Sequence, residues 1–356
     1  MRVRDLAALL CAAAVALLLL ALSAAAAADT VQRIPLVVGL TTVRAVADAQ
    51  GDYESIGYTT EVGSAGYSFT FRAEIPDGPG GKTRELRLVR TVPIADRLHA
   101  RTMRGYLEGD PAVLAGTTPG VSIDIVNELR SSGRAAMTYI DQRPIFGLPS
   151  ARPLKGMVVR VGAGAEDFLI IVNGRRSSVR VLHAKGRLTD ESGAVEMEFR
   201  VLDDPDNPMM LSATGPGFTT RVTRIDFPQA SNSALSIESK LAANEAVDVY
   251  GIYFAFGSDR LHPESDRVLQ EVADLLKKQA GWKLQIDGHT DNIGGDAANL
   301  DLSRRRAAAV KAALVQRYAV AEQRLASGGF GEGRPKDRND TIEGRALNRR
   351  VELKRL

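Results

Sequence analysis

Residues 34 to 227 show the alternation of apolar and polar side chains that is typical of β-strands. Apolar residues occupy every second position from Tyr67 to Phe71 and again from Val195 to Val201. A period of two indicates strands with one buried face. The same region has further apolar, strand-like runs at Leu154 to Val161, Phe168 to Val172 and Val179 to Leu182. Asn173 and Gly174 favour a tight hairpin turn, and we expect a helix at Ile123 to Leu129.

The pattern changes after residue 229, where strand-like and helix-like segments alternate. We expect strands at Val249 to Phe256, Trp282 to Ile286, Leu325 to Phe330 and Arg350 to Leu353, and helices over about Pro263 to Leu276 and Ala297 to Tyr318. Such an order predicts helices packed on one face of a small sheet. The polar stretch Gln229 to Ser233 indicates a boundary. The predicted fold class is α+β, with a β-rich domain at residues 29–228, a linker at 229–248 and an α/β domain at 249–356.

The first 28 residues predict a secretory signal peptide. Arg2 and Arg4 precede an apolar run from Leu6 to Leu22, and small residues follow as far as Ala28. An uncleaved membrane anchor is the alternative, because the run is long enough to cross roughly 30 Å of hydrocarbon. The single cysteine, Cys11, lies within this run. The mature chain would therefore hold neither a disulfide nor a thiolate site.

Composition narrows the classes of function. Apolar residues make up 44% and charged residues 25% of the chain, as in soluble globular proteins, whereas aromatic residues at 5% are too few for the girdles of a membrane barrel. The 46 basic and 43 acidic residues nearly balance, so no nucleic-acid partner is indicated. The four histidines are scattered without the spacing of metal ligands. We therefore expect no metal and no cofactor.

Three polar residues around the second predicted helix suggest a binding site. Asn299 and Arg306 lie seven residues apart and edge one face of this helix, and Asp291 follows the preceding strand. A carboxylate beside a guanidinium, with an amide nearby, suits a zwitterionic ligand such as one end of an amino acid. The alternative is a structural ion pair between Asp291 and Arg306, and the spacing alone favours this alternative.

Three motifs in this region resemble a known family. They are Gly288 to Asn292, Leu302-Ser303-x-x-Arg306-Ala307, and Gly344 to Glu352. In this order they are similar to the OmpA-like peptidoglycan-binding domain, which outer-membrane anchors, peptidoglycan-associated lipoproteins and flagellar motor stators share. The resemblance covers about Val249 to Leu356, close to a third of the chain.

The resemblance implies a βαβαβ-type sheet whose groove binds the free carboxylate and amine of meso-diaminopimelate in the peptidoglycan stem peptide. It assigns the key contacts to Asp291 and Arg306 and supporting roles to Asn299 and Arg349. One position departs from the family. Many members have Phe-Asp-x in the first strand, whereas this chain has Phe254-Ala255-Phe256 and lacks a carboxylate that often lines the groove. We therefore expect weaker binding or a shifted stem preference.

The sequence thus predicts a non-enzymatic protein that binds peptidoglycan and anchors itself to the cell wall. Its expected location is the periplasm or the outer-membrane-associated envelope of a Gram-negative-type bacterium. A hydrolytic triad of His289, Asp291 and Ser303 is disfavoured because no strained nucleophile turn is present. The alternatives are an outer-membrane barrel or an inner-membrane, stator-like component carrying the same tether, or an envelope enzyme with its active site in the N-terminal domain.

Overall fold

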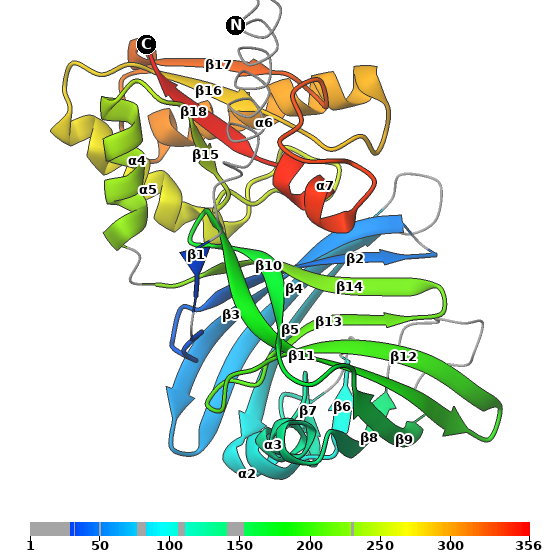
Figure 1. Cartoon of the computed structure of the whole chain (residues 1–356). Coiled ribbons are helices and arrows are strands. Elements are labelled where there is room, and N and C mark those ends of the chain that lie inside the picture. Colours follow the sequence, from blue (N-terminus) through cyan, green and yellow to red (C-terminus); the bar gives the residue numbers. More distant parts are fainter. Residues whose placement is uncertain are drawn as a thin grey trace, which may run out of the picture.

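The computed structural model describes residues 29–31, 33–49, 51–76, 83–105, 111–140, 153–228 and 231–356. The expected signal peptide, and Gln229 and Ala230 of the expected boundary, lie outside these residues. The described chain forms a β-rich half, up to residue 228, and an α/β half, from residue 231, that rests on it (Figure 1). Across these residues, no helix has the length and apolar character that crossing a membrane requires.

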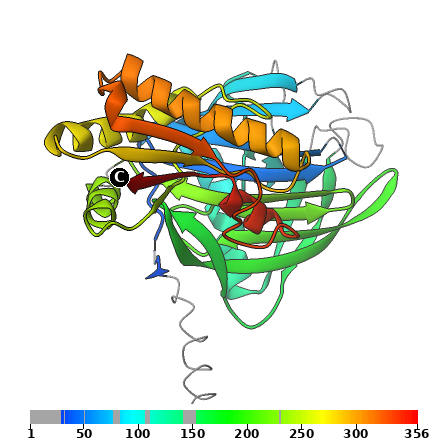
Figure 2. The same cartoon turned by 90° about the horizontal axis from the view of Figure 1, so that it is seen from above.

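The β-rich half is built on one large, strongly curved and mainly antiparallel sheet (Figures 1 and 2). Its described strands are β1 (Asp29–Thr30), β2 (Thr41–Asp48), β3 (Gly51–Gly63), β4 (Gly66–Pro76), β5 (Thr83–Pro93), β6 (Thr102–Arg104), β7 (Thr117–Thr118), β8 (Arg134–Ile140), β9 (Leu154–Arg160), β10 (Glu166–Val172), β11 (Arg175–Asp190), β12 (Gly193–Leu202), β13 (Met210–Gly215) and β14 (Phe218–Asp226). The main order is β5-β4-β3-β2-β14-β13-β12-β11-β9-β8-β6-β7, with β10 joining β11 to β14 and β1 beside β11.

The expected strands of this half are confirmed where the sequence alternates. The Asn173-Gly174 turn joins β10 to β11, and both residues have positive φ, at 49° and 75°. The expected helix is α3 (Ile123–Ser131), whose N-cap Ser122 accepts a hydrogen bond from the Ile125 amide. A second short helix, α2 (Ile94–His99), contacts α3.

Strands β3 and β4 present their side chains to two different spaces. Tyr53 and Phe71 line a cavity of about 260 Å³ inside the β-rich half. Glu54 and Glu74, the neighbours of cavity-lining residues, instead contact residues of the α/β half. Because side chains alternate across a strand, these two strands form a wall shared by both halves.

The α/β half contains a four-stranded sheet and its helices. Its elements are α4 (Ser231–Ala242), β15 (Val247–Val249), the 3-10 turn η2 (Pro263–Ser265), α5 (Asp266–Lys278), β16 (Leu284–Gly288), α6 (Asp296–Gln316), η3 (Glu322–Arg324), β17 (Leu325–Gly329), α7 (Ile342–Asn348) and β18 (Val351–Arg355). The sheet order is β15-β18-β16-β17. β16 and β17 are parallel, and β18 runs antiparallel to both of its neighbours.

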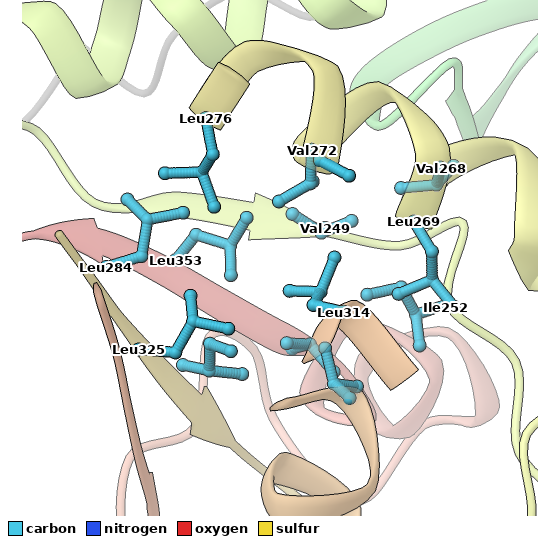
Figure 3. Packing of buried hydrophobic residues seen from close by; sticks show 14 of the residues in the cluster. Val249, Ile252, Val268, Leu269, Val272, Leu276, Leu284, Leu314, Leu325 and Leu353 are labelled. Carbon is cyan, nitrogen blue, oxygen red and sulfur yellow. The ribbon is translucent and has the colours of Figure 1, made fainter. Parts of the chain in front are cut away.

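One apolar cluster forms the core of this half (Figure 3). Helices α4, α5 and α6 meet the face of the sheet that carries Leu284, Ile286 and Leu353. Leu276 of α5 and Leu314 of α6 are fully buried in this cluster. Burial of each such side chain contributes about 1.5–3 kcal/mol, so the α/β half has a substantial core of its own.

Two expectations for this half need correction. The segment expected as a linker, 229–248, carries α4 and β15. Ile237 and Leu241 of α4 enter the core, and Val247 pairs with Leu353. The segment was expected as a linker because Ser and Asn residues lie near its start, and these are favoured at helix starts as well as in loops. The strand expected at Val249 to Phe256 is also corrected, because β15 ends at Val249 and only an isolated bridge forms at Phe254. The chain turns away from the sheet here, and the Tyr253 amide donates a hydrogen bond to Ser265 Oγ.

Candidate functional site

Helix α6 approaches the ends of β16 and β17 unusually closely, and glycines make this possible. A Cβ atom on Gly288 would lie 2.2 Å from the carbonyl oxygen of Ser303, and one on Gly329 would lie 2.4 Å from the amide nitrogen of Arg304. The Ser303 hydroxyl accepts a hydrogen bond from the Gly331 amide at 2.9 Å. The first turns of α6 are therefore fixed at the carboxyl ends of the two parallel strands.

Asp291 lies in the loop that follows β16, and it is 6% exposed. Its Oδ1 accepts a hydrogen bond from the Ile293 amide at 3.1 Å. Its Oδ2 accepts one from Nη1 of Arg349 at 2.5 Å. Arg349 is the C-cap residue of α7. Among the described residues, the ionic partner of Asp291 is thus Arg349, and the alternative of an Asp291–Arg306 pair is not what the structure shows.

Asn299 lies in the first turn of α6 and is buried. Its side-chain amide donates to the Asp291 carbonyl oxygen at 3.0 Å and to Glu332 Oε2 at 2.7 Å. These two bonds hold the Asp291 loop against the loop after β17. Asn299 therefore positions Asp291, and its amide nitrogen is already engaged within the protein.

Arg306 is held against the segment that contains the family departure at Ala255. Its Nε donates to the Ser258 carbonyl oxygen at 2.9 Å and its Nη2 to the Ala255 carbonyl oxygen at 3.4 Å. The guanidinium lies 4.9 Å from the ring centroid of Phe254. The backbone and the ring thus orient Arg306 without a carboxylate at position 255.

The four residues proposed from the sequence come together around one cavity of about 130 Å³, which we call the groove. Asp291, Asn299, Arg306 and Arg349 all line it. The opposite wall comes from β3 and β4 of the β-rich half. The groove therefore lies between the two halves of the molecule.

Glu54 of β3 is a charged groove residue that the sequence did not indicate. Its Oε1 accepts a hydrogen bond from Arg349 Nη2 at 2.8 Å, and its Oε2 accepts one from Arg224 Nη2 at 3.3 Å. Arg349 consequently bridges two carboxylates, Asp291 from its own half and Glu54 from the other. A polar residue in an alternating strand gives no sequence signal for such a contact.

The charges in the groove shift one another's protonation. Burial alone would raise the pKa of Glu54, but the guanidinium groups of Arg349, Arg224 and Arg306 lower it to about 2. Burial, followed by repulsion from Arg349, lowers the pKa of Arg306 to about 10 despite the attraction of Glu54 and Asp291. Arg306 stays charged at neutral pH, yet its charge is incompletely compensated. The groove would therefore gain from a further anionic group near Arg306.

His289 is buried at 2% exposure and stacks on Phe330, with 5.5 Å between the ring centroids. Neither ring nitrogen has a hydrogen-bond partner among the described residues. Burial, together with the charge of Arg350, lowers the pKa of His289 to about 4. The Ser303 hydroxyl donates a hydrogen bond to the Leu300 carbonyl oxygen and accepts one from the Gly331 amide. These environments give His289 and Ser303 structural roles.

Comparisons with known proteins match the same part of the chain. The model of the OmpA family matches residues 253–349, which include all four proposed residues. Outer membrane porin F of Pseudomonas aeruginosa is 42% identical over 101 residues, or 28% of this chain and 29% of the relative. The peptidoglycan-binding protein ArfA of Mycobacterium tuberculosis is 40% identical over 128 residues, or 35% of this chain and 37% of the relative. The match thus spans about a third of these relatives' length.

Among solved structures, the peptidoglycan-associated lipoprotein from Burkholderia pseudomallei is 27% identical. The alignment covers 35% of this chain and 99% of the lipoprotein, with a TM-score of 0.29.

Proposed function

We propose that the OmpA family domain at residues 253–349 binds peptidoglycan non-covalently through the free carboxylate and amine of a stem-peptide diaminopimelate, and so anchors this protein to the cell wall. The observation that supports this most is the convergence of Asp291, Arg306 and Arg349 on one groove. The element order β15, α5, β16, α6, β17 also supports the family's βαβαβ-type arrangement.

The proposed roles follow from the chemistry of each group. Arg306 binds the ligand carboxylate, since a guanidinium offers two parallel donors to a carboxylate. Asp291 accepts from the ligand ammonium with the lone pairs that Ile293 and Arg349 leave free. Asn299 holds the loop of Asp291 in place, and Arg349 orients its carboxylate. The ligand carboxylate would supply the anionic group that Arg306 lacks.

The names of two relatives support an envelope location. ArfA is named as a peptidoglycan-binding protein and porin F as an outer-membrane protein. We include in the proposal a periplasm-facing position, associated with the outer membrane of a Gram-negative-type envelope, and a binding role rather than an enzymatic one.

Co-sedimentation of the full chain with insoluble diaminopimelate-type peptidoglycan tests the proposal. We expect Asp291→Ala together with Arg306→Ala to reduce the bound fraction at least tenfold, because each removes a charged contact of about 1.5–3 kcal/mol. The matched control is Asp301→Ala with Arg305→Ala, an exposed pair on the same helix. It should bind as the wild type does.

A second arm replaces the wall material with a lysine-type peptidoglycan. Lysine lacks the carboxylate that Arg306 would bind, so sedimentation of the wild type should fall markedly. Equal binding of the double variant and its control would contradict the proposed site. Equal binding to both wall types would contradict the proposed ligand group.

A further inference from the structure

The groove is covered by a part of the chain that the family resemblance does not include. Asp52, Glu54 and Ile56 of β3, together with Arg72 and Glu74 of β4, line its second wall. The Phe256 amide, which lies in the segment under Arg306, donates to Glu74 Oε2 at 2.8 Å. Arg260, from the same segment, also pairs with Glu74. The β-rich half therefore lines the same groove as Asp291 and Arg306, the residues proposed to bind the ligand.

Glu54 presents to the groove the chemical group that the proposed ligand would bring. Its carboxylate binds Arg349 and Arg224 and attracts Arg306. Position 255 is an alanine, so the negative charge near Arg306 comes from Glu54 of the other half and from Asp291. Glu54 hydrogen-bonds Arg349 and Arg224 and acts on Arg306 through its charge alone, so a ligand carboxylate at Arg306 would meet a second carboxylate that already neutralises the groove.

Several ion pairs cross the contact between the halves. Ion pairs join Arg345 to Asp52 at 2.6 Å and Arg221 to Glu343 at 2.6 Å. Arg72 pairs with Glu264 at 3.5 Å. The apolar cluster that spans the contact consists of Val43, Ile56 and Tyr253. Polar contacts between domains resemble transient interfaces, and they permit relative motion unless the interface is large and apolar.

We propose that the wall formed by β3 and β4 closes the groove in the full chain, with Glu54 as an internal substitute for the ligand carboxylate, and that wall binding requires the two halves to separate. This inference rests on the proposed function. The apparent affinity for the wall is then the intrinsic affinity multiplied by the fraction of open molecules. Any influence that pulls the halves apart would increase binding.

The first test is co-sedimentation of full-length Glu54→Gln with diaminopimelate-type peptidoglycan. The substitution removes the internal carboxylate, the ionic partner of Arg349 and Arg224 across the contact, so we expect the affinity for the wall to rise about tenfold or more. Glu61→Gln is the matched control. Glu61 lies on the same strand, is exposed, and bonds to Ser68 outside the groove, so this variant should bind as the wild type does.

A second variant separates opening of the halves from a local change in the groove. Glu343 lies on α7 outside the groove and pairs with Arg221 of β14. Glu343→Arg places two like charges across the contact and leaves every groove residue unchanged. We expect it to raise wall binding several-fold, and we expect small-angle scattering to show a larger radius of gyration for this variant.

Arg306→Ala, introduced into each background, distinguishes the two proposals. If Glu54→Gln and Glu343→Arg bind no better than the wild type while Arg306→Ala weakens all three, the closure is wrong and the tether stands. If none of the proteins sediments with the wall, the proposed function fails and the closure fails with it. Stronger binding of both variants, lost on Arg306→Ala, is the result that the closure requires.

Discussion

The core of the α/β half and its contact with the β-rich half are held together by different forces. The core is one apolar cluster supplied by α4, α5, α6 and the sheet. The contact instead relies on charged pairs such as Arg349 with Glu54 and Arg345 with Asp52. Exposing apolar side chains to water raises the free energy of the protein, whereas charged side chains that separate recover their hydration. The difference indicates that the α/β half is a stable domain, whereas its contact with the β-rich half can separate.

The largest effect is expected in the core. Leu314 is fully buried in the cluster, so Leu314→Ala should lower the free energy of unfolding of the α/β half by about 2–5 kcal/mol through lost burial and a cavity. Chemical denaturation measures this. Leu356, which is 65% exposed, provides the control, and Leu356→Ala should leave the unfolding free energy nearly unchanged.

A somewhat smaller effect is expected where α6 touches the sheet. Gly288→Ala would place a Cβ atom 2.2 Å from a backbone oxygen of Ser303. The helix must shift, and the unfolding free energy should fall by about 3 kcal/mol, near the upper end for overpacking. Because Arg306 lies on this helix, peptidoglycan binding should weaken as well. A variant that folds and binds normally would show that the close approach is not required.

Acidification should weaken the α/β half through His289. Its pKa is about 4 in the folded protein and about 6.5 when unfolded. Between pH 6.5 and pH 4, His289 binds a proton in the unfolded chain but stays neutral in the folded chain. The free energy of unfolding therefore falls as the pH falls through this range. We expect a loss of about 2 kcal/mol between pH 7 and pH 5. His289→Phe keeps a ring against Phe330 and cannot titrate. It should flatten this part of the pH profile, and an unchanged slope would contradict the assignment.

The smallest effect is expected at an ion pair of the contact. Asp52 Oδ2 and Arg345 Nη2 lie 2.6 Å apart, yet Asp52 Oδ2 has no aligned hydrogen bond among the described residues. A double-mutant cycle with Asp52→Asn and Arg345→Gln should therefore give a coupling energy of only about 1 kcal/mol. A coupling as large as the loss at Leu314 would remove the distinction between core and contact.

The sequence predicted those features that depend on neighbouring residues in the chain. Alternation identified β4 and β12, the apolar stripe identified α5, and the resemblance of the C-terminal motifs to the OmpA family is confirmed by the match at residues 253–349. Helix α7 was missed because it is short and begins from a Thr341 cap rather than from an apolar stripe. Residues 344–348 of this helix were recognised only as part of the motif Gly344 to Glu352.

The sequence predicted which residues line the candidate site, but it did not predict which of them contact one another. Arg306 and Asp291 were expected to face one ligand, and the structure places both at the groove while pairing Asp291 with Arg349. Asn299 was expected to have a supporting role in the site, and its side chain donates a hydrogen bond to the Asp291 carbonyl oxygen. Glu54 could not be found, because its position depends on how two separately formed halves meet, and no local pattern encodes that.

The order of strands in the α/β half bears on how the chain is made. β18 is the last strand of its sheet in the sequence, and it lies between β15 and β16. The sheet therefore cannot be completed until residues 351–355 have left the ribosome, and β15 has no partner before then. A chain that passes through an export channel while it is being synthesised would carry this half in an unfinished state. The half would assemble only after residue 355 has emerged on the far side.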